Sequence, residues 1–302
     1  MRKLSAMLLI GTMSVAAFAQ PVIDGLLIDT ANWGLSYDIQ DTNTGFGDNY
    51  NELDQLFYVY DANNIYLGIP GNLADNNALT IFFDTDALAG SHPLATAPDP
   101  NVPCVGFYPR ILRYFQGASI DPAAVFTPDY ALTISVGKFP GQSDTLLVYA
   151  CDLTNLNTGE VTVLGIGAVG TGNGLLTGNS GVEIAIDNSN ADGVGPWDPN
   201  FPTPADSGHD PTSATTGIEI SIPRAMLGLT QAQDFYVFAY ITNNAQSDEG
   251  IGGPCGRAAY GSNQALPGLG GWGNMAAFNG DTVLLDISAN PGPAYITLTV
   301  GP

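Results

Sequence analysis

Apolar and polar side chains alternate with a period of two in many segments, and this pattern restricts the fold more than any other feature. Leu79, Ile81 and Phe83 follow this period-two pattern. Successive side chains on a β-strand point to opposite faces, so such a segment covers a core with one face and meets water with the other. The pattern also predicts strands over 56–60, 65–69, 132–136, 182–186, 218–222, 235–241 and 295–300, with more continuous apolar runs at 146–150 and 283–287.

Two of these segments resemble each other. Val182–Asp187 and Ile218–Pro223 both place isoleucines at every second position. Each has a glutamate between them, Glu183 and Glu219, which the alternation predicts on the exposed face.

Turn-forming residues separate the predicted strands. The chain has 37 Gly and 21 Pro, and Asp61–Asn64 joins two alternating segments as a predicted hairpin loop. A single short helical turn is predicted over Pro223–Gly228, with proline at its start and glycine at its end. Short strands joined by turns predict an all-β protein, an antiparallel β-sandwich with long loops.

The N-terminus has the pattern of a secretory signal peptide. Arg2 and Lys3 precede an apolar run over 6–17, and Ala-Phe-Ala at 17–19 has the small residues that signal peptidase recognises. The run is too short to span a bilayer as a helix. We predict Sec-type export with cleavage after Ala19, and therefore a bacterial protein that is extracellular, periplasmic or on the cell surface.

Residues 20–302 are predicted to form a single domain. Residues 88–128 are rich in Pro, Ala and Gly with weak periodicity, which predicts an irregular, loop-rich insertion. Export permits a disulfide among Cys104, Cys151 and Cys255, and the sequence leaves the pairing open.

The chain is strongly acidic. It has 29 acidic residues against 7 basic ones and a formal net charge of −22, which becomes more negative when Arg2 and Lys3 leave with the signal peptide. Such a surface repels phosphate backbones and anionic lipids, so we expect no binding to nucleic acid or to a membrane surface. No stretch after the signal peptide is long and apolar enough for a transmembrane helix, so we expect no membrane insertion. A hydrophobic content of 45% supplies a core and argues against disorder.

Four segments occur in an order typical of one family. They are Ile23-Asp24-Gly25 followed by Asp29 and Trp33, the hairpin 57–69, the strand and Asp-rich turn 81–86, and the segment 216–223 followed by Leu227-Gly228. Together they resemble the family 9 carbohydrate-binding modules and their DOMON-like relatives. Segments 71–73, 83–86 and 262–267 also resemble a group of secreted bacterial β-sandwich proteins of unassigned function.

The family resemblance implies a two-sheet sandwich in which a pair of aromatic rings grips a terminal sugar and calcium supports the loops. The sugar-gripping rings have no residue-by-residue match in this chain. Trp33 falls in the opening motif, where we predict that it belongs to the core rather than to a ligand site.

A loop after the strand 182–186 resembles a calcium-binding loop. Oxygen-bearing side chains at alternate positions precede Gly193, as a hard cation requires. The twelfth position is Pro199 rather than the glutamate of an EF-hand, and the alternative is a turn that bonds its own backbone. The predicted cation ligands are Asp187, Asn188, Asn190 and Asp192, with Asp84 and Asp86 at a strand end as a second set that otherwise caps a turn.

Aromatic residues in loops rich in Gly, Pro and Asn are the predicted ligand contacts. Trp197, Trp272 and Tyr260 occupy such loops, where the faces of sugar rings could stack on them. The alternative is that they pack beneath long loops.

No motif indicates catalysis, and no catalytic residue is predicted. There is no G-x-S-x-G element, and Gly165–Gly178 is glycine-rich but lacks lysine, so it is predicted to be a loop rather than a phosphate-binding motif. Two functions therefore compete. The first is a secreted carbohydrate-binding module with structural calcium and a polysaccharide or cell-surface glycan as partner. The second is a structural, self-associating cell-surface or matrix protein.

Overall fold

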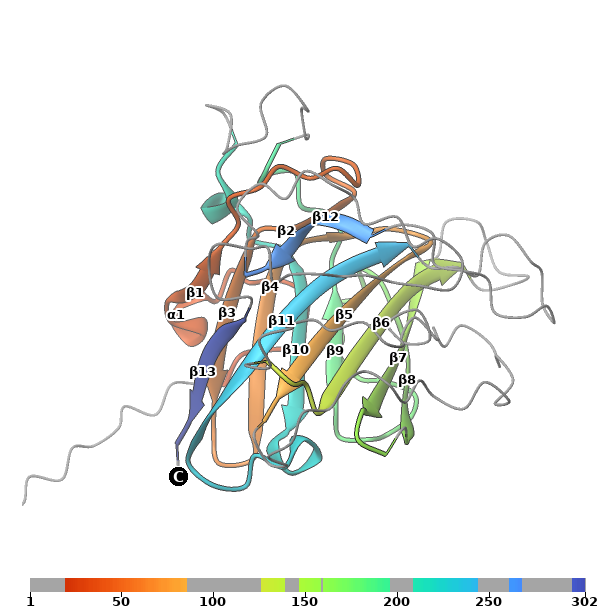
Figure 1. Cartoon of the computed structure of the whole chain (residues 1–302). Coiled ribbons are helices and arrows are strands. Elements are labelled where there is room, and N and C mark those ends of the chain that lie inside the picture. Colours follow the sequence, from red (N-terminus) through yellow and green to blue (C-terminus); the bar gives the residue numbers. More distant parts are fainter. Residues whose placement is uncertain are drawn as a thin grey trace, which may run out of the picture.

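The computed structural model describes residues 20–85, 126–138, 147–158, 160–195, 209–243, 261–267 and 295–301. Within these residues the chain forms two antiparallel β-sheets stacked face to face, which confirms the predicted all-β sandwich (Figure 1). Of the helices in this part of the chain, none is both long and apolar enough to cross a membrane.

Sheet one has six strands. Its order is β1-β3-β4-β10-β9, and β2 pairs with the end of β4. The strands are β1 (Ser36–Ile39), β2 (Asn51–Leu53), β3 (Gln55–Tyr60), β4 (Asn64–Leu73), β9 (Glu183–Ile186) and β10 (Gly217–Pro223). The predicted hairpin is confirmed, since β3 and β4 pair antiparallel across the turn after Tyr60.

Sheet two has seven strands. Its order is β12-β11-β5-β6-β7-β8, and β13 pairs with the first half of β11. The strands are β5 (Asn77–Asp84), β6 (Tyr130–Lys138), β7 (Leu147–Asn155), β8 (Val161–Ala168), β11 (Gln233–Asn243), β12 (Gly261–Leu266) and β13 (Ile296–Val300). At the top of Figure 1, β2 of sheet one lies beside β12 of sheet two, and the Leu53 N–H donates to Gln264 Oε1 at 3.2 Å.

The core fills the space between the sheets with the side chains of the predicted alternation. Ile65, Leu67 and Ile69 of β4 belong to the same buried cluster as Leu79 and Ile81 of β5. Cys151 also lies in this cluster as a free thiol. With Cys151 unpaired, an intramolecular disulfide could join only Cys104 and Cys255, and both lie outside the described residues.

The outer face of sheet one is not open to water, contrary to the prediction from the alternation. The N-terminal segment with the short helix α1 (Thr30–Trp33) packs on it. Trp33 is fully buried beside Leu27, and a Cβ on Gly68 of β4 would lie 2.6 Å from Leu27 Cδ2. The predicted core position of Trp33 is confirmed. The middle of sheet two is likewise buried on its outer face, at Thr80 and Thr133 among others.

Glu219 was predicted to be exposed, and this prediction is wrong. The side chain is fully buried, and its Oε2 accepts hydrogen bonds from the backbone N–H groups of Asp24 and Gly25, both at 2.7 Å. The reason is that the N-terminal segment covers this part of β10. The glutamate of β10 therefore holds the turn at Asp24 and Gly25.

The predicted glycine-rich loop at 165–178 begins as a strand. Gly165 and Gly167 lie in β8, where Gly165 has φ +131° beside a register shift in the pairing with β7. A Cβ on Gly167 would overlap the ring of Tyr149. Glycine thus replaces the apolar side chains that normally mark a strand, and the alternation is lost.

The predicted helical turn after β10 is confirmed. It is a 3₁₀ helix (Arg224–Leu227) that ends at Gly228 with φ 72°, and a second 3₁₀ turn lies at Pro211–Ser213. Nearly all of the predicted insertion at 88–128, and the predicted strand at 283–287, lie outside the described residues.

Candidate functional site

The loop that follows β9 carries the predicted calcium ligands, and its first two side chains bond to backbone. Asp187 Oδ1 accepts from the Ser189 N–H at 2.8 Å. Asn188 forms two hydrogen bonds with the backbone of Leu73, at 2.9 Å through Oδ1 and at 2.7 Å through Nδ2. Asp192 is exposed. These contacts stabilise the loop against the end of β4.

Asn190 is the loop residue that turns inward. Its Nδ2 donates to Glu52 Oε1 at 3.0 Å and to Asp54 Oδ2 at 2.9 Å. Glu52 Oε1 also accepts from Asn72 Nδ2 at 3.0 Å. We refer to Glu52, Asp54, Asn72 and Asn190 as the acid–amide cluster.

The cluster is buried and incompletely hydrogen-bonded. Glu52, Asp54 and Asn72 have no exposed surface, and Asn190 has very little. Asp54 Oδ1 accepts from the Val194 N–H at 3.0 Å. Glu52 Oε2 and Asn72 Oδ1, in contrast, are buried acceptors without a hydrogen-bond partner.

Local chain geometry brings these residues together. Glu52 of β2 lies directly opposite Asn72 of β4, and opposed residues of antiparallel strands share a face. Asp54 follows two positions later, on the same side of an extended chain. Gly193 has φ +125°, and a Cβ there would overlap the Asp54 carboxylate, so glycine lets the loop backbone approach this acid.

Burial favours the protonated, neutral form of both acids in the cluster. Burial, followed by the charge of Asp48, raises the pKa of Glu52 to about 7. Burial, followed by the charge of Glu52, raises the pKa of Asp54 to about 9. The hydrogen bonds to the two carboxyl groups come from amide and backbone N–H groups rather than from a cationic side chain.

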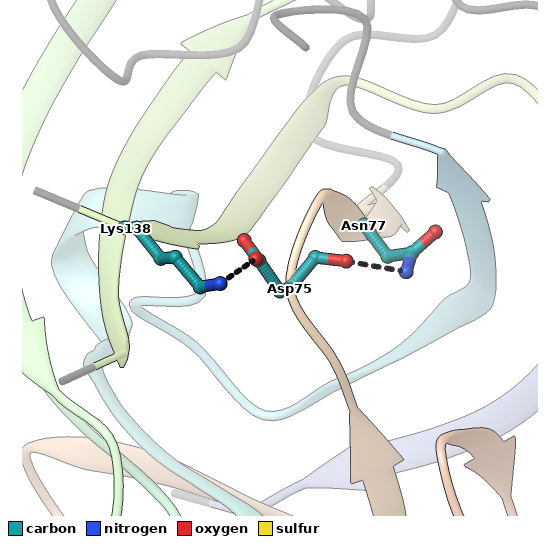
Figure 2. A network of polar contacts seen from close by, with 3 residues as sticks. All are labelled: Asp75, Asn77 and Lys138. Atoms are coloured by element: carbon teal, nitrogen blue, oxygen red, sulfur yellow. Dashed lines mark hydrogen bonds and ion pairs between the residues drawn. The ribbon is translucent and has the colours of Figure 1, made fainter. Parts of the chain in front are cut away.

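The basic side chains of the described residues, Lys138 and Arg224, interact with groups outside the acid–amide cluster. Lys138 Nζ forms an ion pair with Asp75 Oδ2 at 3.4 Å at the surface, where the Asp75 carbonyl also accepts from Asn77 (Figure 2). The Arg224 guanidinium donates to the carbonyls of Leu229, Asp61 and Gly301. Neither cation contributes a hydrogen bond to the acid–amide cluster.

The second predicted cation set is only half described. Asp84 Oδ2 accepts from the Thr127 N–H at 2.8 Å, which links the end of β5 to the segment before β6. Asp86 lies outside the described residues, as do the predicted ligand contacts Trp197, Trp272 and Tyr260. Across the part of the chain that is described, no group of three or more His, Cys, Asp or Glu side chains could hold a metal ion.

A group of three tyrosines lies at the β1 edge of sheet one, where β1, β3 and β13 come together on the left of Figure 1. The ring centroid of Tyr58 lies 5.6 Å from that of Tyr37 and 6.0 Å from that of Tyr60. Tyr58 is buried and its hydroxyl donates to the Thr299 carbonyl of β13 at 3.1 Å. Tyr37 and Tyr60 are 50% and 41% exposed. We call Tyr37, Tyr58 and Tyr60 the tyrosine group.

The sequence indicated neither the tyrosine group nor the carboxylates of the acid–amide cluster. Tyr58 and Tyr60 appeared only as members of an alternating strand. Glu52 and Asp54 lie just before that strand, and a signal was present, because two acids at i and i+2 share one face.

Comparisons with known proteins gave no relatives: no protein-family model, no curated protein and no solved structure matched this chain.

Proposed function

We propose that this chain is a secreted, non-catalytic binding module whose ligand is a carbohydrate, with calcium as structural support. The observation that carries this proposal is the tyrosine group, two of whose rings are about half exposed. Exposed aromatic faces pack against the C–H faces of sugar rings, and tyrosine hydroxyls add hydrogen bonds. The family resemblance of the sequence supports the same function.

The arrangement also limits what can bind. Tyr58 is held by Thr299 and contacts Phe235 of β11 at 5.6 Å between centroids, so the central ring is rigid. Rigid rings lose little conformational entropy when a ligand binds. The net charge of −22 favours a neutral glycan over a polyanionic one.

The proposal is tested with Tyr37→Ala and Tyr60→Ala in a glycan-array screen followed by titration of the bound glycan. We expect each variant to weaken binding by about fivefold, since one ring contact contributes on the order of 1 kcal/mol. Tyr50→Ala is the control, because Tyr50 is 67% exposed and lies in the loop before β2. Trp197→Ala and Trp272→Ala form a second arm. The absence of any glycan binding by the unmodified protein contradicts the proposal.

Self-association is the second candidate function, and one observation favours it. Strand β1 lies at the edge of sheet one, and Leu35, Tyr37 and Ile39 around it are exposed at alternate positions. An exposed apolar edge strand is prone to pair with a second chain. Size-exclusion chromatography with and without calcium tests it: an Ile39→Lys substitution would abolish a dimer formed through this edge.

A further inference from the structure

We propose that the acid–amide cluster is a binding site for a divalent cation with oxygen ligands, best matched by calcium. Glu52 and Asn72 supply the ligand oxygens, and Asp54 supplies a second carboxyl group beside them. This inference deepens the calcium component of the proposed function. It does not depend on sugar binding.

The first support is the pair of oxygen atoms without partners. Glu52 Oε2 and Asn72 Oδ1 are both buried, both are acceptors, and neither receives a hydrogen bond. The amide of Asn72 is fixed in this orientation, because its Nδ2 donates to Glu52 Oε1 and to the Asn190 carbonyl at 2.9 Å. A buried acceptor without a donor is costly, and a bound ion is one of the ways in which proteins satisfy it.

The second support is the charge of the site. Two carboxylates are linked through the single amide of Asn190, and each is fully buried. Two like charges in a buried site destabilise the folded state unless a cation or protons neutralise them. The loop that carries Asn190 also closes over Asp54 through Val194, so the acids are held in place rather than free to move apart.

The chemistry of the ligands selects the ion. Carboxylate and amide oxygens suit hard cations, whereas zinc prefers nitrogen and sulfur ligands. Calcium accepts uncharged amide and carbonyl oxygens in a flexible geometry, while magnesium requires a near-ideal octahedron and retains several waters. Calcium is therefore the probe of choice, with magnesium as the comparison.

Thermal unfolding at pH 7.5, after treatment with EDTA and then with added calcium, tests the site. The unmodified protein is expected to gain roughly 5–10 °C in Tm when calcium is about 100-fold above its Kd. Glu52→Gln keeps the shape and hydrogen bonding of the side chain but removes a charge. This variant is expected to lose most of the calcium-dependent gain in Tm. It is also expected to lose the single tight calcium site that calorimetric titration should detect in the unmodified protein.

Three comparisons keep the outcome clear. In EDTA, Glu52→Gln is expected to have a Tm no lower than that of the unmodified protein, because the variant lacks a buried charge. A Tm of this size shows that the variant folds, so a missing calcium response then reports the loss of the site. Glu219→Gln changes a buried glutamate elsewhere and retains the gain. Asp192→Asn removes an exposed carboxylate of the predicted calcium loop and also retains it.

Two results would overturn the inference. One is an unmodified protein whose Tm is the same in EDTA and in calcium. This result would mean that protons, and not calcium, neutralise the two acids. The other is a Glu52→Gln variant with the full calcium-dependent gain, which would place calcium at acids outside the acid–amide cluster. A normal calcium response in a protein that binds no glycan would retain the cation site and reject the carbohydrate function.

Discussion

Glu219→Ala is expected to lower the free energy of unfolding by about 3–5 kcal/mol, the largest single-residue loss outside the apolar core. The Glu219 carboxylate accepts both the Asp24 and the Gly25 N–H at 2.7 Å, and both N–H groups lose this acceptor when the carboxylate is removed. Each buried donor left unpaired costs about 1–3 kcal/mol. The cavity left by the side chain adds to this loss.

Denaturant unfolding measures the effect, and two matched variants interpret it. Glu219→Gln retains a side-chain oxygen that can accept from the two N–H groups, so a smaller loss is expected. Glu183→Ala changes the corresponding glutamate of the neighbouring strand β9, which is partly exposed, and should fall within about 0.5 kcal/mol of the unmodified protein. Equal losses for Glu219→Ala and Glu183→Ala would contradict the assigned role of the Glu219 carboxylate.

The contrast between Glu183 and Glu219 shows how much of the structure can be predicted from the sequence alone. The alternation of isoleucines predicted both strands and their inner faces correctly, because strand periodicity is a local property. It predicted that both glutamates lie on the outer face of the sheet, which is correct. It also predicted that both are exposed, which is wrong for Glu219. The segment that covers Glu219 lies almost 200 residues earlier in the chain, and no local pattern reports such a contact.

The candidate sites were less predictable for a related reason. Asn190 was chosen from a loop motif, and the structure places it between Glu52 and Asp54, two acids that no motif connects to it. Their contact depends on where β2 pairs with β4 and how the loop after β9 folds back. Tyr37 and Tyr60 come from different strands, β1 and β3, and alternation within one strand cannot indicate that their rings are brought together.

Without calcium, the protein is expected to become less stable as the pH rises from about 5 to about 9. Glu52 and Glu219 have their pKa raised to about 7 and Asp54 to about 9, in each case mainly by burial. Between the ordinary pKa near 4 and these values, the folded state binds more protons than the unfolded state, so the free energy of unfolding falls with pH. The contribution is complete below pH 4 and is lost as the pH passes 7 and then 9.

The size of this loss can be bounded from Glu219, which lies apart from the coupled pair. Its pKa rises from 4.5 to about 7, and one unit corresponds to about 1.4 kcal/mol, so this residue alone accounts for about 3 kcal/mol. Asp61 has a lowered pKa, to which its hydrogen bond from Tyr66 contributes although burial opposes it. It therefore stabilises the fold above its ordinary pKa and loses that contribution in acid, so stability should peak in mildly acidic solution.

Urea unfolding at pH 5, 7 and 9, in EDTA and in calcium, measures both the slope and its origin. Calcium competes with protons for the deprotonated carboxylates, so it should flatten the decline between pH 7 and 9 in the unmodified protein. Asp54→Asn should flatten the same part of the curve in EDTA, because the group with the highest raised pKa is absent. Added salt screens repulsion among the 29 acidic residues at the surface but acts weakly on buried groups. A decline that salt removes and Asp54→Asn leaves unchanged would therefore assign the pH dependence to surface charge and not to the acid–amide cluster.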